Sequence, residues 1–265
     1  MTGEPDGIFE SAAGPAIAYR RVAATGGAGL AGVVWLGGFN STMDGAKATS
    51  LEAWARGRGR ACLRFDYSGH GLSGGALEDG TVSRWLAEAR QALDTLTAGP
   101  QILVGSSMGG WIALLLALAR VTQGGADGAR IAGLVLIAPA ADMTERLIWA
   151  DASPEMRRAI EVDGVWLRPS AYGDGPYPIT RALIEDGRNH LILDERLAPG
   201  CPVRILHGLD DPDVPWRHSL ALVDCLEGED VTVTFVKGGD HRLSTDRDIA
   251  RLRAVLDEVA AATER

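Results

Sequence analysis

Ser107 is the residue whose setting first suggests chemistry. It is the central residue of a Gly-x-Ser-x-Gly pattern with Gly105 and Gly109. An apolar segment typical of a buried strand, 102–104, precedes the pattern, and an apolar run, 111–120, follows it. A strand, a tight turn and a helix are the context in which such a pattern exposes a nucleophilic hydroxyl, because only small neighbours let the strand and helix pack against a strained turn. We therefore predict that Ser107 is a nucleophile.

A serine hydroxyl becomes nucleophilic only beside a base that takes its proton and a third group that orients the base. After a turn of this kind, an acid and then a histidine are expected further along the chain, each directly after a strand. His241 follows the predicted strand 231–236, so we predict that it is the base. The other histidines lie in a turn-rich loop, in an irregular central segment, ahead of the acidic residues and on a helix: His70, His190, His207 and His218.

Three aspartates follow the predicted strand 203–207, and any of them could orient the base: Asp210, Asp211 and Asp213. Their spacing alone does not choose between them. The cluster also has the composition of a cation site, but the sequence places no matching histidine or carboxylate cluster beside it, and acidic turns are usually solvated. We therefore expect no metal here.

Acyl transfer at Ser107 would need N–H donors placed in advance around the developing oxyanion. The backbone N–H of Met108 is one candidate, because this residue directly follows the serine at the predicted helix start. The backbone N–H of Phe39 is the other, because Phe39 follows the double-glycine turn that ends the predicted strand 32–36. We predict that both act as oxyanion donors.

Apolar strands alternate with helical patterns along most of the chain, which is typical of an α/β fold with a mostly parallel sheet and helices on both faces. The first two predicted strands form a hairpin around a Gly-Pro turn. Strands are predicted at 8–10, 16–21, 32–36, 61–65, 102–104, 131–137, 203–207 and 231–236, and helices at 44–58, 81–96, 111–120, 216–226 and 248–261.

The alternation breaks between residues 141 and 197, a stretch longer than a usual connection. We predict that 141–197 is a lid inserted over the catalytic edge, and that 1–140 and 198–265 form the core. Within the lid, helical pieces are predicted at 143–150, 154–161 and 180–187, with Pro- and Gly-rich turns near 169–178. A lid above the strand ends must face the substrate, so its large aromatic side chains are predicted to bind substrate: Trp149, Trp166, Tyr172 and Tyr177.

Composition excludes several functional classes. The chain has 265 residues, of which 46% are hydrophobic, and a net charge of −9. The acidic balance disfavours nucleic acid as a partner, and no apolar run is long enough to span a membrane. No leader segment is visible and the three cysteines have no paired spacing, so we expect free thiols and a cytoplasmic location. The sequence does not determine an oligomeric state.

A Gly-x-Gly-x-x-Gly pattern, 69–74, is followed by Asp94 about twenty residues later, as in dinucleotide-binding proteins. However, no helix is predicted to open at residue 74, and Asp94 lies inside the predicted helix 81–96. We therefore expect no nucleotide and no other cofactor.

Four segments together resemble the α/β-hydrolase superfamily, and the resemblance extends from about residue 33 to the last helix. Within that superfamily they are similar to the branch of the mitochondrial palmitoyl-protein thioesterase and acyl-glucuronide esterase with its bacterial relatives. The segments are Arg64–Ser73, Gly99–Trp111, Gly164–Ser170 and Asp240–Arg242.

The resemblance implies an α/β-hydrolase fold and a serine hydrolase of carboxylic esters or thioesters that forms an acyl-enzyme. Its substrate would be a small molecule or an acylated partner, with a depalmitoylase or acyl-glucuronide esterase as the branch's specific examples. The matching positions imply a triad of Ser107, Asp211 and His241. Many superfamily members carry His-Gly where this chain has Gly37-Gly38, a departure that leaves a backbone donor possible. The mitochondrial members carry a transit peptide that is not visible here.

Fold-level likeness does not separate hydrolysis from related chemistry. The same triad serves acyltransferases, C–C bond hydrolases and cofactor-free haloperoxidases. A non-catalytic binding module is a further alternative, which the intact order of serine, aspartate and histidine disfavours.

Overall fold

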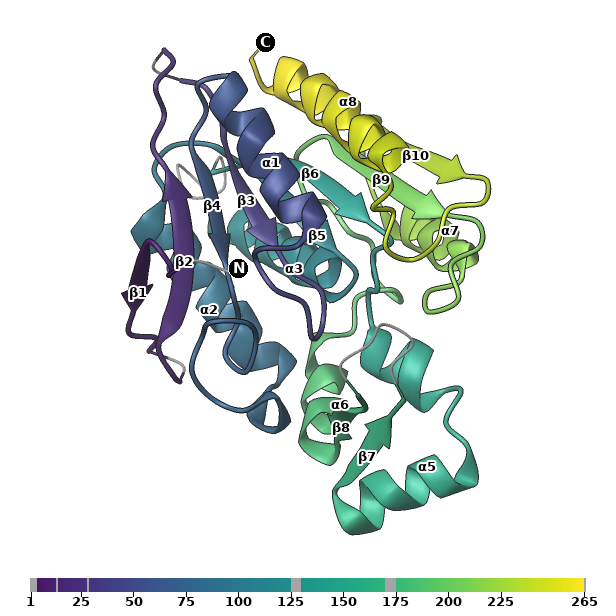
Figure 1. Ribbon diagram of the computed structural model, residues 1–265. Coiled ribbons are helices and arrows are strands. Elements are labelled where there is room, and N and C mark those ends of the chain that lie inside the picture. Colours follow the sequence, from purple (N-terminus) through teal and green to yellow (C-terminus); the bar gives the residue numbers. More distant parts are fainter. Residues whose placement is uncertain (1–3, 13, 28, 125–129, 170–174, 265) are drawn as a thin grey trace.

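A single large sheet organises the chain. The computed structural model describes residues 4–12, 14–27, 29–124, 130–169 and 175–264. The sheet has eight strands in the order β1-β2-β4-β3-β5-β6-β9-β10 (Figure 1). β1 and β2 pair antiparallel, as do β2 and β4, whereas all other pairings in this sheet are parallel. The predicted α/β class with a mostly parallel sheet is confirmed.

The strands of this sheet are β1 (Gly7–Phe9), β2 (Ile17–Val22), β3 (Gly32–Leu36), β4 (Cys62–Phe65), β5 (Gln101–Ser106), β6 (Ile131–Ile137), β9 (Val203–Gly208) and β10 (Val231–Val236). The helices that cover it are α1 (Ala46–Gly57), α2 (Val82–Leu96), α3 (Met108–Gln123), α7 (Trp216–Cys225) and α8 (Asp246–Thr263), and a short 3-10 turn, η1 (Leu77–Asp79), precedes α2.

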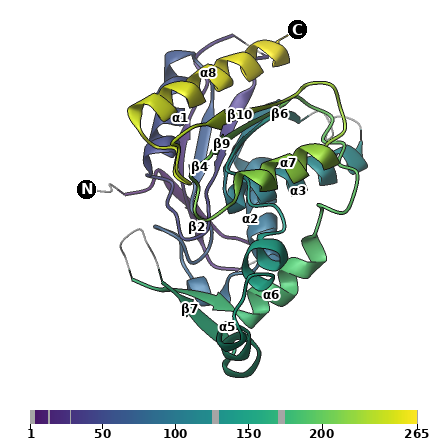
Figure 2. The same cartoon turned by 90° about the vertical axis from the view of Figure 1, so that its right-hand side faces the viewer.

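Helices lie on both faces of the sheet, with α1 and α8 on one face and α2, α3 and α7 on the other (Figure 2). On the first face, Trp54 and Leu256 are buried against Val33 and Val104 of the central strands. On the second, Trp85 and Trp111 are fully buried. β3 and β6 have no polar side chains, as expected of strands whose two faces are both covered by helices.

The predicted elements of the core are present, with small differences at their ends. β3, β6 and β10 have the predicted bounds, and the elbow helix begins three residues earlier than the predicted residue 111. α8 begins at Asp246 because Thr245 caps it, accepting a hydrogen bond from the Asp248 N–H while the Asp248 carboxylate accepts from the Thr245 N–H. Such a capping box fixes a helix start that periodicity alone leaves open.

The segment between β6 and β9 forms a separate body beyond the carboxyl ends of the parallel strands (Figure 1). Its helical pieces were predicted, but its two strands were not. The sequence indicated turns near 169–178, where the second strand begins, and no element was predicted at 165–168. The strands pair antiparallel as a two-stranded sheet. Its elements are η2 (Thr144–Trp149), α5 (Pro154–Arg158), η3 (Ala159–Asp163), β7 (Val165–Arg168), β8 (Tyr177–Thr180), α6 (Arg181–Gly187) and η4 (Arg188–His190). We call this segment the insertion; its predicted boundaries at 141 and 197 stay a prediction.

Asp142 ties the two ends of the insertion together. Its side chain is completely buried, and its oxygens accept hydrogen bonds from the backbone N–H groups of Ile192 at 2.8 Å and Leu193 at 2.9 Å. Close by, the Ala141 carbonyl oxygen accepts from Nε2 of His218 at 2.7 Å. A buried carboxylate bound to two amides holds the chain where it leaves and re-enters the core.

The three cysteines are free, as predicted, although only Cys62 is fully buried. Burial raises the pKa of the Cys62 and Cys201 thiols to about 12, so neither is a reactive thiolate near neutral pH. Among the described residues, no helix combines the length and the apolar character that a bilayer-crossing segment requires.

Candidate active site

Ser107 lies at the turn from β5 to α3, with φ of 54° and ψ of −118°, a conformation that residues with side chains rarely adopt. The flanking glycines are required by contact. A Cβ on Gly105 would lie 2.3 Å from the Gly109 carbonyl oxygen, and a Cβ on Gly109 would lie 2.0 Å from the Leu36 carbonyl oxygen. The strand, the helix and β3 thus approach too closely for any side chain, and the turn presents Ser107 at the start of α3.

His241 reaches the Ser107 hydroxyl from the loop after β10. Its Nε2 lies 3.1 Å from the Ser107 Oγ, and its Nδ1 lies 2.7 Å from an Asp211 Oδ. An ionised carboxylate can only accept, so Nδ1 carries the proton and Nε2 is free to accept from the serine hydroxyl. The loop is anchored next to the ring, where Leu243 is buried and its N–H donates to the Asp240 carboxylate.

Asp211 is the aspartate that the structure places beside His241. Its side chain is completely buried. One oxygen accepts from the N–H groups of Asp213 and Val214, each at 2.9 Å, while the other accepts from His241. Burial alone would raise the pKa of Asp211, but the hydrogen bonds from His207 and His241 outweigh it and hold that pKa well below its usual range. Asp211 is therefore ionised near neutral pH.

The neighbouring aspartates have other surroundings. Asp210 is exposed. Asp213 turns to the insertion, where its carboxylate pairs with Arg168 at 3.2 Å. The three sequence candidates for the acid are thereby distinguished by packing.

His207 is a supporting residue that the sequence interpretation underrated. It is fully buried at the end of β9, with Nε2 2.9 Å from the Val214 carbonyl oxygen and 3.3 Å from an Asp211 oxygen. Nε2 therefore carries a proton, and Nδ1 lies 2.6 Å from the Ser219 hydroxyl oxygen. This arrangement places a buried imidazole behind Asp211 and gives that carboxylate a further donor. The signal available in the sequence was the spacing of four residues between His207 and Asp211.

Folding brings His241 to the acidic turn, so the reason given from the sequence for discounting a metal, the absence of a nearby histidine, was wrong. Asp211, Asp213 and His241 offer ligand atoms that all lie within 4.8 Å of one another. These atoms are nevertheless engaged with each other and with protein donors. Asp211 accepts from two backbone N–H groups and His241, and Asp213 pairs with Arg168. Both carboxylates of this group therefore have donors within the protein.

The turn that carries Phe39 lies directly beside Ser107. A Cβ on Gly38 would lie 3.3 Å from the Ser107 Cβ, so this part of the backbone passes the serine at close range. The turn is fixed by Ser41, whose hydroxyl donates to the Gly38 carbonyl oxygen at 2.7 Å. Met108 occupies the first position of α3, where helical N–H groups have no acceptor within the helix. The two predicted oxyanion donors are thus on adjacent backbone segments.

A hollow of about 170 Å³ adjoins Ser107 and His241 on the side of the insertion. We call it the apolar pocket. Hydrophobic side chains form much of its wall, its polar side chains include Asn40 and His241, and its charged side chains are the pair Arg168 and Asp213. The apolar side chains are Phe39, Ala140, Met143, Leu147, Ile148, Ile179 and Val214, with Tyr177 beside them.

Of the four aromatic residues predicted to bind substrate, the structure brings Tyr177 to this pocket, where its ring lies 5.5 Å from that of Phe39. Trp149 and Trp166 do not line it. The ring of Trp149 makes cation–π contacts with two guanidinium groups, those of Arg157 at 5.2 Å and Arg188 at 5.3 Å. Trp166 packs against the hydrophobic core. Tyr172 lies outside the described residues.

Three features together define one class of protein. They are a serine at a strained strand–helix turn, a histidine after the last strand that contacts this serine, and a buried aspartate that accepts a hydrogen bond from the histidine. The chain belongs to the α/β-hydrolase family: the model of the alpha/beta hydrolase family matches residues 26–259.

Individual relatives agree with this membership. The chain is 36% identical over 229 residues to the human mitochondrial palmitoyl-protein thioesterase ABHD10, a match that covers 86% of this chain and 72% of the relative. Among solved structures, it superposes on a putative hydrolase from Agrobacterium vitis S4 with a TM-score of 0.90 and 42% identity over 96% of both chains. The mouse alpha/beta hydrolase domain-containing protein 10 gives a TM-score of 0.84 and 35% identity, covering 96% of this chain and 97% of the mouse chain. The chain is thus a hydrolase related to thioesterases.

Proposed function

We propose that this protein hydrolyses carboxylic esters and thioesters through an acyl-enzyme, with Ser107 as nucleophile, His241 as base and Asp211 as the residue that orients His241. The observation that carries the proposal is the continuous line of hydrogen bonds from the Ser107 hydroxyl through His241 to the buried Asp211. The contacts match these roles, since the Asp211 carboxylate accepts from Nδ1 of His241 and Nε2 of His241 faces the Ser107 hydroxyl.

In the first step, the Ser107 Oγ attacks the acyl carbon while Nε2 of His241 takes the serine proton. The tetrahedral intermediate then collapses, and His241 returns the proton to the leaving oxygen or sulfur, which departs as alcohol or thiol. In the second step, His241 takes a proton from water while the water oxygen attacks the acyl carbon. The second tetrahedral intermediate then collapses, the bond between the acyl carbon and the Ser107 Oγ breaks, and His241 returns the proton to that Oγ as the acid departs. Asp211 stabilises the imidazolium formed in each step and stays ionised itself.

The oxyanion of both intermediates would accept hydrogen bonds from the N–H groups of Phe39 and Met108. These donors are backbone groups on fixed turns, so they need no reorganisation when charge develops. The close approach of Gly38 to Ser107 supports this role, because the adjacent N–H of Phe39 is carried by the same turn.

The apolar pocket is suited to the acyl group. Hydrophobic side chains of the insertion and of the turn after β3 form much of its wall beside Ser107. Each methylene that the pocket buries contributes about 0.8 kcal/mol. We therefore expect kcat/KM to rise as the acyl chain lengthens from acetyl and then to level off or fall at the limit of the pocket. In this role residues 141–197 act as the lid predicted from the sequence.

The relatives named as palmitoyl-protein thioesterases support the thioester part of the proposal. Of the alternatives, transfer to an acceptor, C–C bond cleavage, haloperoxidase chemistry and non-catalytic binding, none is favoured by a specific observation. The cytoplasmic location stays a prediction, and the relatives carry mitochondrial names.

The test is covalent labelling by a fluorophosphonate followed by turnover of a thioester. We expect one equivalent of label on Ser107, none in the Ser107→Ala variant, and release of free acid from S-butyryl thioesters in water. A protein that neither reacts with the label nor releases acid would refute the hydrolase mechanism. Transfer of the acyl group to an added alcohol in preference to water would identify a transferase instead.

A further inference from the structure

One edge of the main sheet is formed by β10, and among the described residues this strand pairs with β9 alone. It is six residues long, whereas β1, at the opposite edge, has three. Native proteins usually protect an edge with a short strand, a bulge, a proline or a charged side chain, because an open edge pairs readily with another chain. β10 pairs with β9 in unbroken register and consists of valine, threonine and phenylalanine only. It therefore has none of these protections.

The hydrogen bonds to β9 show which backbone groups of β10 point outward. The Val203 N–H donates to the Asp230 carbonyl oxygen, and the Leu209 N–H donates to the Val236 carbonyl oxygen, each at 2.9 Å. Successive residues of a strand direct their N–H and C=O groups to opposite sides, so the even-numbered residues of β10 face β9. The outward-facing residues are Val231, Val233 and Phe235.

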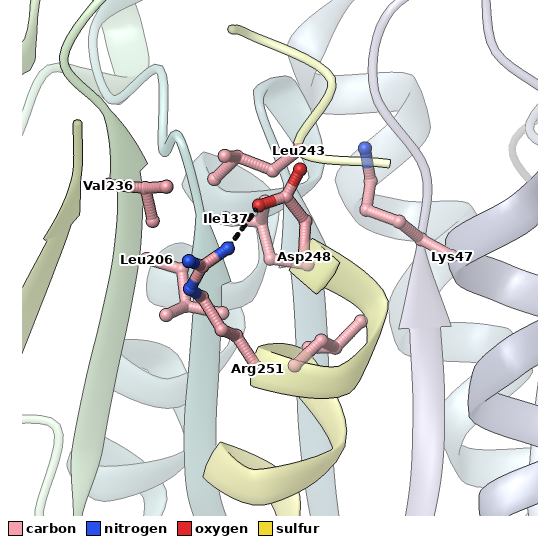
Figure 3. Close-up of a pocket in the computed structure, with 8 residues that line it drawn as sticks. Lys47, Ile137, Leu206, Val236, Leu243, Asp248 and Arg251 are labelled. Atoms are coloured by element: carbon pink, nitrogen blue, oxygen red, sulfur yellow. Dashed lines mark hydrogen bonds and ion pairs between the residues drawn. The ribbon is translucent and has the colours of Figure 1, made fainter. Parts of the chain in front are cut away.

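The side chains of β10 hold the strand through its two faces. On the face of α8, Val236 shares a small pocket with Leu243 (Figure 3). On the face of α7, the ring of Phe235 lies 5.5 Å from that of Trp216. Helices on both faces thus fix the strand, and two of its side chains stay exposed, those of Thr232 and Thr234.

The charges that flank β10 are complementary under a two-fold rotation. Glu229 lies two residues before the strand and Lys237 directly after it, and both are exposed. If two copies pair antiparallel with Val233 opposite Val233, all the outward-facing residues fall in hydrogen-bonded pairs, and Glu229 of each copy lies opposite Lys237 of the other. A parallel pairing in the same register would place like charges together, which destabilises a strand pair.

We propose that the outer edge of β10 binds a second copy of this chain, which pairs antiparallel through the same edge and joins the two sheets into one. A two-fold axis at Val233 makes the interface self-complementary, so assembly stops at a dimer. Leu220 of α7 is 39% exposed and lies one helical turn after Trp216, on the same stripe of the helix. It adds apolar area beside the edge. The inference goes beyond the proposed hydrolysis and does not depend on it.

The test is sedimentation equilibrium of the full chain between roughly 1 and 100 µM, a range that resolves micromolar affinities. We expect a reversible dimer. Lys237→Glu places Glu229 opposite a second carboxylate in both symmetric pairs, so the dissociation constant should rise at least roughly 10-fold. Glu229→Lys should have a similar effect. The double variant Glu229→Lys/Lys237→Glu restores opposite charges and should recover most of the affinity.

The matched control is Glu185→Lys, at an exposed position on α6, which changes the net charge as Glu229→Lys does. It should leave the dissociation constant unchanged. A wild type that sediments as a monomer at every concentration would overturn the proposal and leave the edge to an extended segment of a different protein. Failure of the double variant to recover affinity, or an equal loss in Glu185→Lys, would also overturn it.

A cross-link tests the register of the pairing. Thr232 of one copy should lie opposite Thr234 of the other in a non-hydrogen-bonded pair, with Cα atoms about 4.5 Å apart, a distance that a disulfide spans. Thr232→Cys/Thr234→Cys should therefore form a covalent dimer on mild oxidation. Thr234→Cys alone should not, nor should the wild type with its three free cysteines. Equal cross-linking of Thr234→Cys alone would contradict the axis at Val233.

The dimer and the proposed hydrolysis are tested separately. Ser107→Ala should dimerise as the wild type does, because Ser107 is remote from the edge in the order of strands. A dimer that shows no reaction with the fluorophosphonate would retain the interface and refute the hydrolase. An active monomer would refute the interface and retain the hydrolase.

Discussion

Two hollows meet at Ser107, and they differ in the chain segments that build them. Much of the apolar pocket comes from the insertion between β6 and β9, whereas a second hollow, of about 360 Å³, is built from the turn after β3, the start of α1 and the loop after β10. These core segments are fixed by the same sheet that positions Ser107 and His241. The insertion is tied to the core through contacts such as the hydrogen bond between Nε2 of His218 in α7 and the Ala141 carbonyl oxygen. The second hollow is thus coupled to the catalytic framework, and acyl recognition depends on a more independent part of the fold.

The largest expected effect comes from removing the Ser107 hydroxyl, because Ser107 lines both hollows. Ser107→Ala should lower kcat/KM by roughly 10⁴-fold or more for every thioester, whatever its acyl chain or leaving group. Ser106→Ala is the matched control, because Ser106 ends β5 one residue earlier. Steady-state assays of both variants with acetyl and hexanoyl thioesters provide the measurement. Similar losses in the two variants would contradict the assignment of the nucleophile.

Removing the charge of Asp211 should have the next largest effect. Asp211→Asn cannot hold the proton on Nδ1 of His241, so we expect a fall in kcat of order 10³- to 10⁴-fold with the fold retained. Asp210→Asn, at an exposed position, should stay close to wild type. If Asp210→Asn were the damaging change, the packing described around His241 would not operate in solution. The fall in kcat should again be the same for every acyl chain and every leaving group.

A change in the apolar pocket should alter the dependence of kcat/KM on acyl-chain length and leave its dependence on the leaving group unchanged. Leu147→Ala removes part of the pocket wall, and each buried methylene contributes about 0.8 kcal/mol, so kcat/KM for hexanoyl thioesters should fall by up to ~10-fold relative to acetyl. Leu167→Ala is the control, because Leu167 belongs to the same insertion but is 56% exposed. A chain-length profile that both variants leave intact would show that the insertion does not bind the acyl chain.

The sequence by itself determined the elements whose cause is local. β3, β6 and β10 were predicted with their observed bounds. β3 and β6 are largely apolar and buried, whereas β10 alternates valine with threonine and is only partly buried. Ser107 was found from five consecutive residues and their neighbours, since the strained turn needs glycine on both sides. His241 was found from its place after the last strand of an alternating pattern. Asp211 was selected over Asp210 and Asp213 only through resemblance to a known superfamily.

Tertiary structure decided what depends on contacts between distant segments. Which aspartate meets His241 is set by the packing of two loops 30 residues apart, and the role of His207 depends on the same packing. Trp149 was assigned to the substrate from its type, but cation–π contacts with Arg157 and Arg188 engage its ring elsewhere. β7 and β8 are four residues each and stabilise one another as a pair, so no periodic signal revealed them. The two hollows beside Ser107 likewise exist only once β3, α1, β10 and the insertion meet around one serine.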